Sequence, residues 1–235
     1  MKKLTIVIPV FNEEKGIEDS IHRMFSNLKK LNLNPEVLCV DDSIDKTYEI
    51  LRRLEKTYND LKVIHRTQRS GVGSAIRLGI EKAKGESIIV FMADAPEDVK
   101  YFPSIIKKLE EGHDLVQTSR FFKECKMVGY PFKKRIFNWL CNNSIKVAFF
   151  ESKLKDFSSL FKAFNKKKIN GLKLSADEFD LGLEIVLKSI RKNYSIVEVP
   201  VNWVEREKGE SKLKLSRYAK YYFTRTLKIW LTYWG

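Results

Sequence analysis

Short apolar runs alternate with polar, helix-patterned stretches along the first half of this sequence. The first run, Leu4–Val10, is almost continuously apolar, which is typical of a strand buried on both faces of a parallel sheet. Strands that alternate with helices predict βαβ units joined by crossover helices. We therefore expect an α/β fold with a mostly parallel sheet flanked by helices.

The predicted elements extend along the whole chain, without an internal repeat or a linker rich in Pro, Gly or Ser. Strands are predicted at residues 4–10, 37–40, 61–64, 87–92, 114–118 and 196–201. Helices are predicted at residues 13–31, 45–58, 72–83, 132–149, 177–192 and 213–234. We expect one continuous fold, with a second half that is less regular than the first.

Polar residues follow the predicted strands of the first half. In open parallel sheets, ligands bind beyond the carboxyl ends of the strands, so these residues are expected to meet at one edge. They are Pro9–Glu13, Asp41–Ser43, Arg66, Arg69–Gly73, Asp94 and Ser119–Arg120. Carboxylates, arginines and a glycine turn at one edge predict a site for a phosphate-bearing ligand, with or without a metal ion.

Each of these groups also has a structural explanation. Asp41 or Asp42 could cap the helix that follows. Asp94 could be a turn residue before a proline, and Arg120 a solvated surface charge. The Gly71–Gly73 turn does not match a dinucleotide-binding fingerprint, and no Walker lysine follows it. The conjunction of all these groups at successive strand ends favours the ligand site.

The sequence carries 44 Lys and Arg against 30 Asp and Glu, a net charge of +14. Such an excess is typical of proteins that bind nucleic acid, an anionic membrane surface or phosphorylated substrates. No helix-turn-helix, RNP or zinc pattern is present, so we predict no nucleic-acid partner. No apolar run approaches the roughly 18 residues of a membrane span. The N-terminus lacks a signal-peptide cleavage pattern and the cysteines form no disulfide framework, so we expect a cytoplasmic location.

Several segments match the motifs of one protein family, in family order: Ile8–Glu14, Val40–Thr47, Arg69–Ala75, Met92–Asp94, Thr118–Phe121 and Arg206–Leu213. On these segments the chain resembles the family 2 inverting glycosyltransferases with the GT-A fold, most closely the dolichol- or polyprenyl-phosphate sugar synthases. The resemblance implies a GT-A, Rossmann-like sheet. It also implies transfer of a sugar, with inversion, from GDP-mannose or a UDP-hexose to a dolichyl or polyprenyl phosphate.

For the donor, the resemblance implies a nucleotide pocket at the strand ends. One of the two adjacent aspartates would hydrogen-bond the base, since a carboxylate accepts hydrogen bonds from an N–H edge. The residues implied to bind the nucleotide sugar are Pro9, Phe11, Glu13, Asp41, Asp42, Arg69, Gly71, Gly73 and Asp94.

The resemblance also implies a divalent cation, Mg²⁺ or Mn²⁺, on the donor diphosphate. Asp94 stands at the second Asp of the family's Asp-x-Asp motif, but Met92 replaces the first. A hard cation prefers several oxygen ligands. Asp94 is therefore the metal ligand that we predict, and Glu97 or Asp98 could supply another. The alternative is an inactive relative of the family whose metal site is damaged.

The implied catalytic residues are Asp94, Arg120 and Asp156. A phosphate acceptor is already anionic and needs no strong general base, whereas a sugar hydroxyl does. Asp156 is the base that we predict if the acceptor is instead a saccharide hydroxyl, which is the alternative function. The residues implied to bind an acceptor phosphate are Lys133, Arg135, Arg206, Ser211 and Lys212. The chain departs from the family pattern at Leu160 and Lys162, where a Gly and an Arg are usual.

The last predicted helix is cationic and amphipathic. Apolar and aromatic residues repeat at helical spacing, while Arg225 and Lys228 fall on the opposite face. This pattern predicts an interfacial membrane helix, although a helix docked on the catalytic domain fits too, and both can hold. We therefore divide the chain into a catalytic domain, 1–212, and a C-terminal helix, 213–235. The expected location is peripheral, on the inner face of the cell membrane, at an anionic lipid surface; the sequence predicts no oligomeric state.

Overall fold

The computed structural model describes residues 3–92, 94, 96–149, 153–204 and 215–233. The strands are β1 (Leu4–Val10), β2 (Glu36–Asp41), β3 (Leu61–His65), β4 (Ser87–Val90), β5 (Leu115–Ser119), β6 (Met127–Val128), β7 (Lys162–Asn165), β8 (Ile196–Pro200) and β9 (Trp203–Val204). The helices are α1 (Ile17–Lys30), α2 (Thr47–Thr57), α3 (Val72–Lys82), η1 (Pro96–Tyr101), α4 (Phe102–Glu110), α5 (Phe132–Phe149), α6 (Lys166–Asn170), α7 (Leu181–Arg191) and α8 (Leu215–Tyr233).

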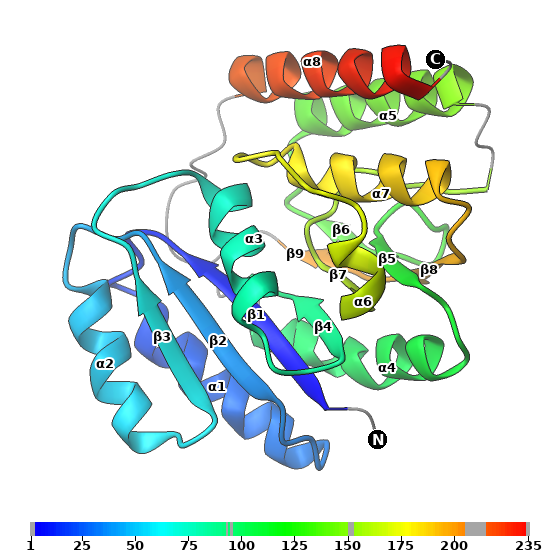
Figure 1. Ribbon diagram of the computed structural model, residues 1–235. Helices are drawn as coiled ribbons and strands as arrows, with labels where there is room; N and C mark the ends of the chain where they lie inside the picture. Colours follow the sequence, from blue (N-terminus) through cyan, green and yellow to red (C-terminus); the bar gives the residue numbers. More distant parts are fainter. Residues whose placement is uncertain (1–2, 93, 95, 150–152, 205–214, 234–235) are drawn as a thin grey trace.

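One central sheet has the strand order β3-β2-β1-β4-β7-β5-β8 (Figure 1). Neighbouring strands run parallel except at β7, which is antiparallel to both β4 and β5. This arrangement confirms the mostly parallel sheet with flanking helices that the sequence predicts. The short strands β6 and β9 pair separately, as a small parallel ladder.

Helices cover both faces of the sheet, and each face has its own apolar core. Ile8 of β1 packs on one face with side chains of α1, α2 and α4. Val7 of β1 packs on the other face with side chains of α3, α5, α7 and α8. Successive side chains of a strand point to opposite faces, so a continuously apolar strand such as β1 supplies both cores.

The antiparallel strand β7 is the main element that the sequence pattern does not predict. Its first residue, Lys162, pairs with Val90 of β4 and with Gln117 of β5. Because β7 runs against its neighbours, it begins at the edge where they end. The loop that precedes it, from Asp156 to Phe161, therefore lies at the carboxyl edge of the parallel strands, beside the residues that follow β4 and β5. The helices η1, α4 and α6 were not predicted either.

Two helices begin later than predicted. The backbone of Asn12 is in the left-handed region, with φ 52°, and its amide donates to Ser43 Oγ at 2.7 Å. This contact ties the loop after β1 to the loop after β2, so α1 begins at Ile17 rather than near residue 13. The helix α7 begins at Leu181 rather than at residue 177, because Asp177 lies in a connecting segment that contacts α3.

The helix α8 packs on the catalytic fold. It lies beside α5 and α7 (Figure 1) and contributes Tyr222 and Ile229 to the core on that face of the sheet. Arg225 was expected on the solvent-facing side of this helix, and this expectation is wrong: Arg225 points inward and pairs with Asp180 and Glu184 of the catalytic fold. The predicted division between residues 212 and 213 lies outside the described residues and stays a prediction.

Candidate functional site

The carboxylate of Asp41, at the end of β2, is fully buried and holds the strand ends together. Its Oδ1 accepts hydrogen bonds from the amide and the hydroxyl of Ser43, at 3.2 and 2.5 Å. Its Oδ2 lies 2.7 Å from Nδ1 of His65, at the end of β3, and the His65 ring stacks on Tyr48. Both oxygens of Asp41 are therefore used by neighbouring residues of the chain.

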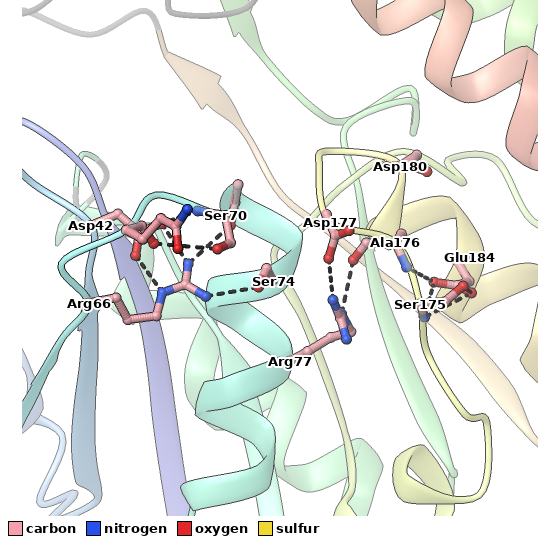
Figure 2. Close-up of polar contacts among 12 residues, drawn as sticks. Asp42, Arg66, Ser70, Ser74, Arg77, Ser175, Ala176, Asp177, Asp180 and Glu184 are labelled. Carbon is pink, nitrogen blue, oxygen red and sulfur yellow. Dashed lines mark hydrogen bonds and ion pairs between the residues drawn. The ribbon is translucent and has the colours of Figure 1, made fainter.

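Asp42 forms a forked ion pair with Arg66, the residue that follows β3 (Figure 2). Arg66 Nε and Nη2 donate to the two carboxylate oxygens of Asp42, each at 2.5 Å. Arg66 Nη1 also donates to Ser74 Oγ in α3, at 2.8 Å, and the amide of Ser70 lies 3.5 Å from Asp42. Bidentate pairing of this kind fixes orientation as well as charge. It links the ends of β2 and β3 to the first turn of α3.

Two residues predicted to line a nucleotide pocket are in contact. The guanidinium of Arg69 lies over the ring of Phe11, with 4.1 Å between the guanidinium carbon and the ring centroid. The amide of Glu13 donates to Thr47 Oγ1 at 2.9 Å, so the loop after β1 is anchored on α2. Pro9 lies inside β1, opposite Val40 of β2. The structure thus brings the predicted donor residues of β1, β2 and the loop after β3 to one edge.

The glycine turn before α3 is packed against backbone. Gly71 has φ 88°, a left-handed conformation that favours glycine. A Cβ atom on Gly73 would lie 2.6 Å from the carbonyl oxygen of Glu178 and 2.7 Å from that of Ala176. The two glycines therefore permit close approach of residues 176–178, a requirement that the sequence alone does not reveal.

Asp94 follows β4 at the same edge and is partly buried. Between residues 3 and 233, in the described part of the chain, no three Asp, Glu, His or Cys side chains converge as a metal site. Met92, two residues earlier, offers a thioether where a hard cation prefers oxygen. Asp94 is the predicted metal ligand, and its position after β4 puts it at this edge of the sheet.

Arg120 follows β5, Asp156 lies in the loop that precedes the neighbouring strand β7, and the two side chains form an ion pair. Arg120 Nε donates to Asp156 Oδ2 at 3.2 Å, and Asp156 Oδ1 accepts from the amide and hydroxyl of Ser158, at 2.8 and 2.6 Å. Asp156 is fully buried, and Arg120 is mostly buried. The Arg120 guanidinium also faces the ring of Tyr130, 5.6 Å from its centroid. Burial raises the pKa of the Tyr130 hydroxyl, and the positive charge of Arg120 partly offsets this.

The family model described as glycosyl transferase family 2 matches residues 5–172, which is most of the chain. The chain belongs to glycosyl transferase family 2.

Relatives of this family 2 glycosyltransferase include the dolichol-phosphate mannosyltransferase of Pyrococcus furiosus. The two are 32% identical over 214 residues, which cover 90% of this chain and 59% of the relative. The undecaprenyl-phosphate 4-deoxy-4-formamido-L-arabinose transferase of Photorhabdus laumondii is 28% identical over 214 residues, covering 90% of this chain and 63% of that protein. The chain thus spans about three fifths of the length of these relatives.

Among solved structures, the glucosyl-3-phosphoglycerate synthase of Mycobacterium tuberculosis has a similar fold, with a TM-score of 0.71 at 17% identity. The match covers 99% of this chain and 80% of the synthase, which was crystallised with Mn²⁺, UDP and glucosyl-3-phosphoglycerate. This likeness confirms the GT-A fold that the sequence predicts.

Lys162, where this family 2 glycosyltransferase departs from the usual family pattern, lies inside the protein. Its side chain is fully buried beneath the Arg120–Asp156 side of the edge, and its Nζ donates to the carbonyl of Gly182 at 2.6 Å. Burial lowers the pKa of Lys162 to about 7, although the nearby Asp156 charge opposes the shift. A buried lysine at the start of a strand gives no hydrophobic signal, so the pattern could not find it.

Glu198 of β8 is a second residue of this site that the sequence did not single out. Its carboxylate accepts the amides of Lys155 and Asp156, at 2.9 Å, and so fixes the turn that carries Asp156. Burial raises the pKa of Glu198, and these backbone hydrogen bonds partly compensate. Arg66, which the sequence placed at a strand end without a role, belongs to the same set of positioning residues.

The predicted acceptor residues are only partly covered by the structure. Lys133 and Arg135 lie in the first turn of α5, and Arg135 is exposed. Arg206, Ser211 and Lys212 lie outside the described residues, so their roles stay predictions. Among the helices of the described residues, none combines the length and the apolar composition needed to cross a membrane.

The helices α5 and α8 of the family 2 glycosyltransferase share an apolar outer surface, which we call the α5–α8 face. Helix α5 buries two polar residues, Asn138 and Asn142, while its Trp139 is 60% exposed. The exposed apolar side chains of this face are Phe132, Ile136, Trp139, Leu140 and Val147 of α5 and Phe223, Leu227, Trp230 and Leu231 of α8. A large exposed apolar surface of this kind marks an interaction site.

Proposed function

We propose that this protein transfers a sugar from a nucleoside diphosphate sugar to a polyprenyl or dolichyl phosphate, with inversion at the anomeric carbon. The observation that carries the proposal is the layout of one sheet edge. The Asp42–Arg66 fork lies at one end of the edge, Asp94 follows the middle strand β4, and the Arg120–Asp156 pair lies at the other end. Two relatives whose names specify lipid-phosphate acceptors support the choice of acceptor.

The donor nucleotide is assigned to the ends of β1, β2 and β3. The contact between Phe11 and Arg69 offers an aromatic ring and a guanidinium plane beside the pocket. We assign base recognition to Asp42 and its surroundings rather than to Asp41, because the Asp41 side chain is fully buried whereas that of Asp42 keeps a small exposed fraction. The assay below distinguishes a guanosine from a uridine nucleotide as the donor.

Asp94 is the residue that we assign to a divalent cation, Mg²⁺ or Mn²⁺. A single carboxylate fits such a cation only together with the oxygens of the donor diphosphate. When bound, the cation would neutralise the charge that develops on the leaving nucleoside diphosphate. Met92 contributes no oxygen, so we expect cation binding to depend strongly on the presence of the donor.

Arg120 is assigned to the reacting phosphates. An acceptor phosphate oxygen attacks the anomeric carbon, the bond to the donor diphosphate breaks, and the diphosphate leaves with the electron pair. The acceptor is already anionic, so no side chain needs to remove a proton. A positioned cation stabilises the charge transferred in this step. Asp156 holds Arg120 in place through the 3.2 Å contact with Nε.

The alternative, transfer to a saccharide hydroxyl, requires a general base. Asp156 is the residue predicted for that task, but its two oxygens accept hydrogen bonds from Arg120 and Ser158. Both carboxylate oxygens are thus occupied by donors of the chain itself, so neither is presented to a sugar hydroxyl. The geometry therefore supports the phosphate acceptor better.

We also propose that the α5–α8 face binds an anionic membrane, on the cytoplasmic side of the cell membrane. Trp139 and Trp230 are aromatic side chains of the type that lie at lipid interfaces, and Arg135, Lys220 and Lys228 provide exposed cations around them. A lipid-linked acceptor reaches an enzyme only at the bilayer surface. An apolar face with basic side chains around it is suited to meet such an acceptor at the bilayer.

The test is a transfer assay with GDP-mannose, UDP-glucose and UDP-N-acetylhexosamine as donors and a short polyprenyl phosphate as acceptor, with and without Mg²⁺ or Mn²⁺. We expect one donor to be used and the product to carry the inverted anomeric configuration, read from its NMR coupling constants. Asp94→Asn should lower the rate about a hundredfold or more, with an unchanged circular dichroism spectrum. Transfer to a saccharide but not to the lipid phosphate would reject the acceptor class, and full activity of Asp94→Asn would reject the metal assignment.

A further inference from the structure

The segment Ser175–Asp180, which precedes α7, caps the N-terminus of α3. The first amides of a helix have no partner within the helix. Here the amides of Gly73 and Ser74 donate to the carbonyl of Asp177, at 2.8 and 3.1 Å. Arg77 of α3 reinforces the contact, since its Nε donates to the carbonyl of Ala176 at 3.1 Å and its Nη2 pairs with the Asp177 carboxylate (Figure 2).

The same segment is anchored at its other side by Arg225 of α8. Arg225 Nε donates to Asp180 Oδ2 at 2.8 Å, and its Nη1 donates to Ser175 Oγ at 2.9 Å. Nη1 also lies 3.4 Å from Glu184 Oε1. Asp180 and Glu184 are both buried, so Arg225 is the cation of α8 that meets their charge inside the protein.

Glu184 holds the backbone of the segment. Its carboxylate accepts the amide of Ala176 at 2.7 Å and the amide of Ser175 at 3.0 Å. Burial alone would raise the pKa of Glu184, but the hydrogen bonds from Lys188, Ser175 and Ala176 lower it overall. Glu184 is therefore a charged anchor whose position depends on the cations around it, Lys188 and Arg225.

On the donor side, the capped turn of α3 carries the fork on Asp42. Ser74, whose amide is held by Asp177, accepts a 2.8 Å hydrogen bond from Arg66 through its hydroxyl. Arg66 in turn binds both oxygens of Asp42 and lies 3.4 Å from the carbonyl of Gly71. Arg225 is thus connected to the carboxylate of Asp42 by hydrogen bonds and ion pairs, through the backbone of residues 175–180 and the first turn of α3.

We propose that Arg225 is a positioning residue for the donor nucleotide site. It holds Ser175–Asp180 against α3, and this contact sets the turn at Gly71–Ser74 that orients Arg66 and Asp42. The inference rests on the proposed function, because it assigns the nucleotide to that turn. Since Arg225 belongs to α8, this assignment gives the helix of the α5–α8 face a role in donor binding as well.

The test compares Arg225→Gln with Arg191→Gln in the full chain. Arg191 is a matched control, because it also joins α7 to α8, through a 3.2 Å hydrogen bond to Thr232, but it does not contact Ser175–Asp180. Hydrogen exchange of the Gly73 and Ser74 amides should be about tenfold faster in Arg225→Gln and close to the wild-type rate in Arg191→Gln. Arg225→Lys keeps the positive charge but loses the separate guanidinium hydrogen bonds to Asp180 and Ser175. Its exchange rates should lie between those of the other two variants.

The functional readout is calorimetric binding of UDP and GDP in the presence of Mg²⁺. The Kd of the nucleotide that the wild-type protein binds should rise about tenfold in Arg225→Gln and change little in Arg191→Gln. Equal effects of the two substitutions, or unchanged exchange at Gly73 and Ser74, would reduce Arg225 to a structural residue. Absence of UDP and GDP binding to the wild-type protein would overturn the proposed function and the donor-site role with it. Normal nucleotide binding by Arg225→Gln would overturn the role of Arg225 alone.

Discussion

The donor side of this sheet edge, at the ends of β1, β2 and β3, and the proposed acceptor side, around Arg120 and Asp156, differ in how fully the chain satisfies their polar groups. At the donor side, each oxygen of Asp41 and Asp42 accepts a hydrogen bond from a neighbouring residue, and Arg66 donates through Nε and both terminal nitrogens. Groups held in this way cost little reorganisation when a ligand binds. The donor side is therefore preorganised by its own residues.

The acceptor side contains groups that the described residues satisfy less completely. Gln117 Oε1 and Asn142 Nδ2 are buried and have no hydrogen-bond partner within the described part of the chain. Beside Gln117, Lys162 is a fully buried amine that donates to one carbonyl. A buried polar group without its full complement of partners costs stability.

The α5–α8 face extends this difference to the surface. On the donor side, exposed apolar side chains are isolated, as at Ile44, whereas α5 and α8, which contact each other, carry several each. Isolated apolar residues are normal on a protein surface, but large patches mark interaction sites. The comparison shows that the donor side satisfies its polar groups within the chain, while the other half exposes an apolar surface that the proposed membrane contact would cover.

The largest expected effect separates catalysis from donor binding. Arg120→Gln removes the cation beside Asp156 and should lower the transfer rate about a hundredfold or more, with the Kd of the donor nucleotide nearly unchanged. Arg69→Gln should do the opposite, raising the nucleotide Kd with a smaller loss of rate at saturating donor. Steady-state kinetics and calorimetry on both variants measure this. A loss of nucleotide affinity in Arg120→Gln as large as in Arg69→Gln would break the division into two sides.

The donor side was largely predictable from sequence, because its residues follow strands whose apolar runs are local and whose order in a parallel sheet is restricted. Asp42, Arg69 and Phe11 are found together for this reason. The role of Gly73 was not predictable, since the backbone that approaches it comes from residues 176–178, far along the chain.

The acceptor side was less predictable, because its elements break the pattern on which prediction relies. Strand β7 starts with a buried lysine and has no crossover helix, so nothing in the local sequence marks it. Helical periodicity placed Arg225 on a polar face, but the buried carboxylates of Asp180 and Glu184, supplied by α7 and the residue before it, make that face an interior one. Contacts between distant segments decided both outcomes.

A smaller effect is expected at the membrane. Trp139→Gln combined with Trp230→Gln should weaken binding to vesicles of phosphatidylglycerol and phosphatidylcholine by about tenfold or more, because each ring loses apolar burial in the lipid interface. Ile44→Gln is a matched control, since Ile44 is 85% exposed but lies on the donor side. Vesicle co-sedimentation measures the change. Equal binding by all three proteins would show that the α5–α8 face does not contact lipid.

The last expected effect concerns stability rather than binding or catalysis, and it comes from Lys162. Its pKa falls from 10.5 to about 7 on burial, so between these values the unfolded chain holds a proton that the folded protein has lost. The free energy of unfolding therefore rises with pH across this window, and the cost of burying the charge is greatest below it. Lys162→Met removes the titrating group while keeping an apolar stem of similar length.

The variant should accordingly gain more stability over the wild type at low pH than at high pH. The gain is expected to shrink by about 2 kcal/mol between about pH 6 and about pH 9, measured by urea unfolding of both proteins at each pH. Comparing the two proteins cancels the titration of all groups other than Lys162 and those that it influences, of which Asp156 is the nearest named charge. A difference that does not vary with pH would mean that Lys162 stays protonated in the folded protein. The acceptor side would then carry a permanent buried cation beside Asp156. Its cost in stability would come from the buried charge of Lys162 as well as from the polar groups that lack hydrogen-bond partners.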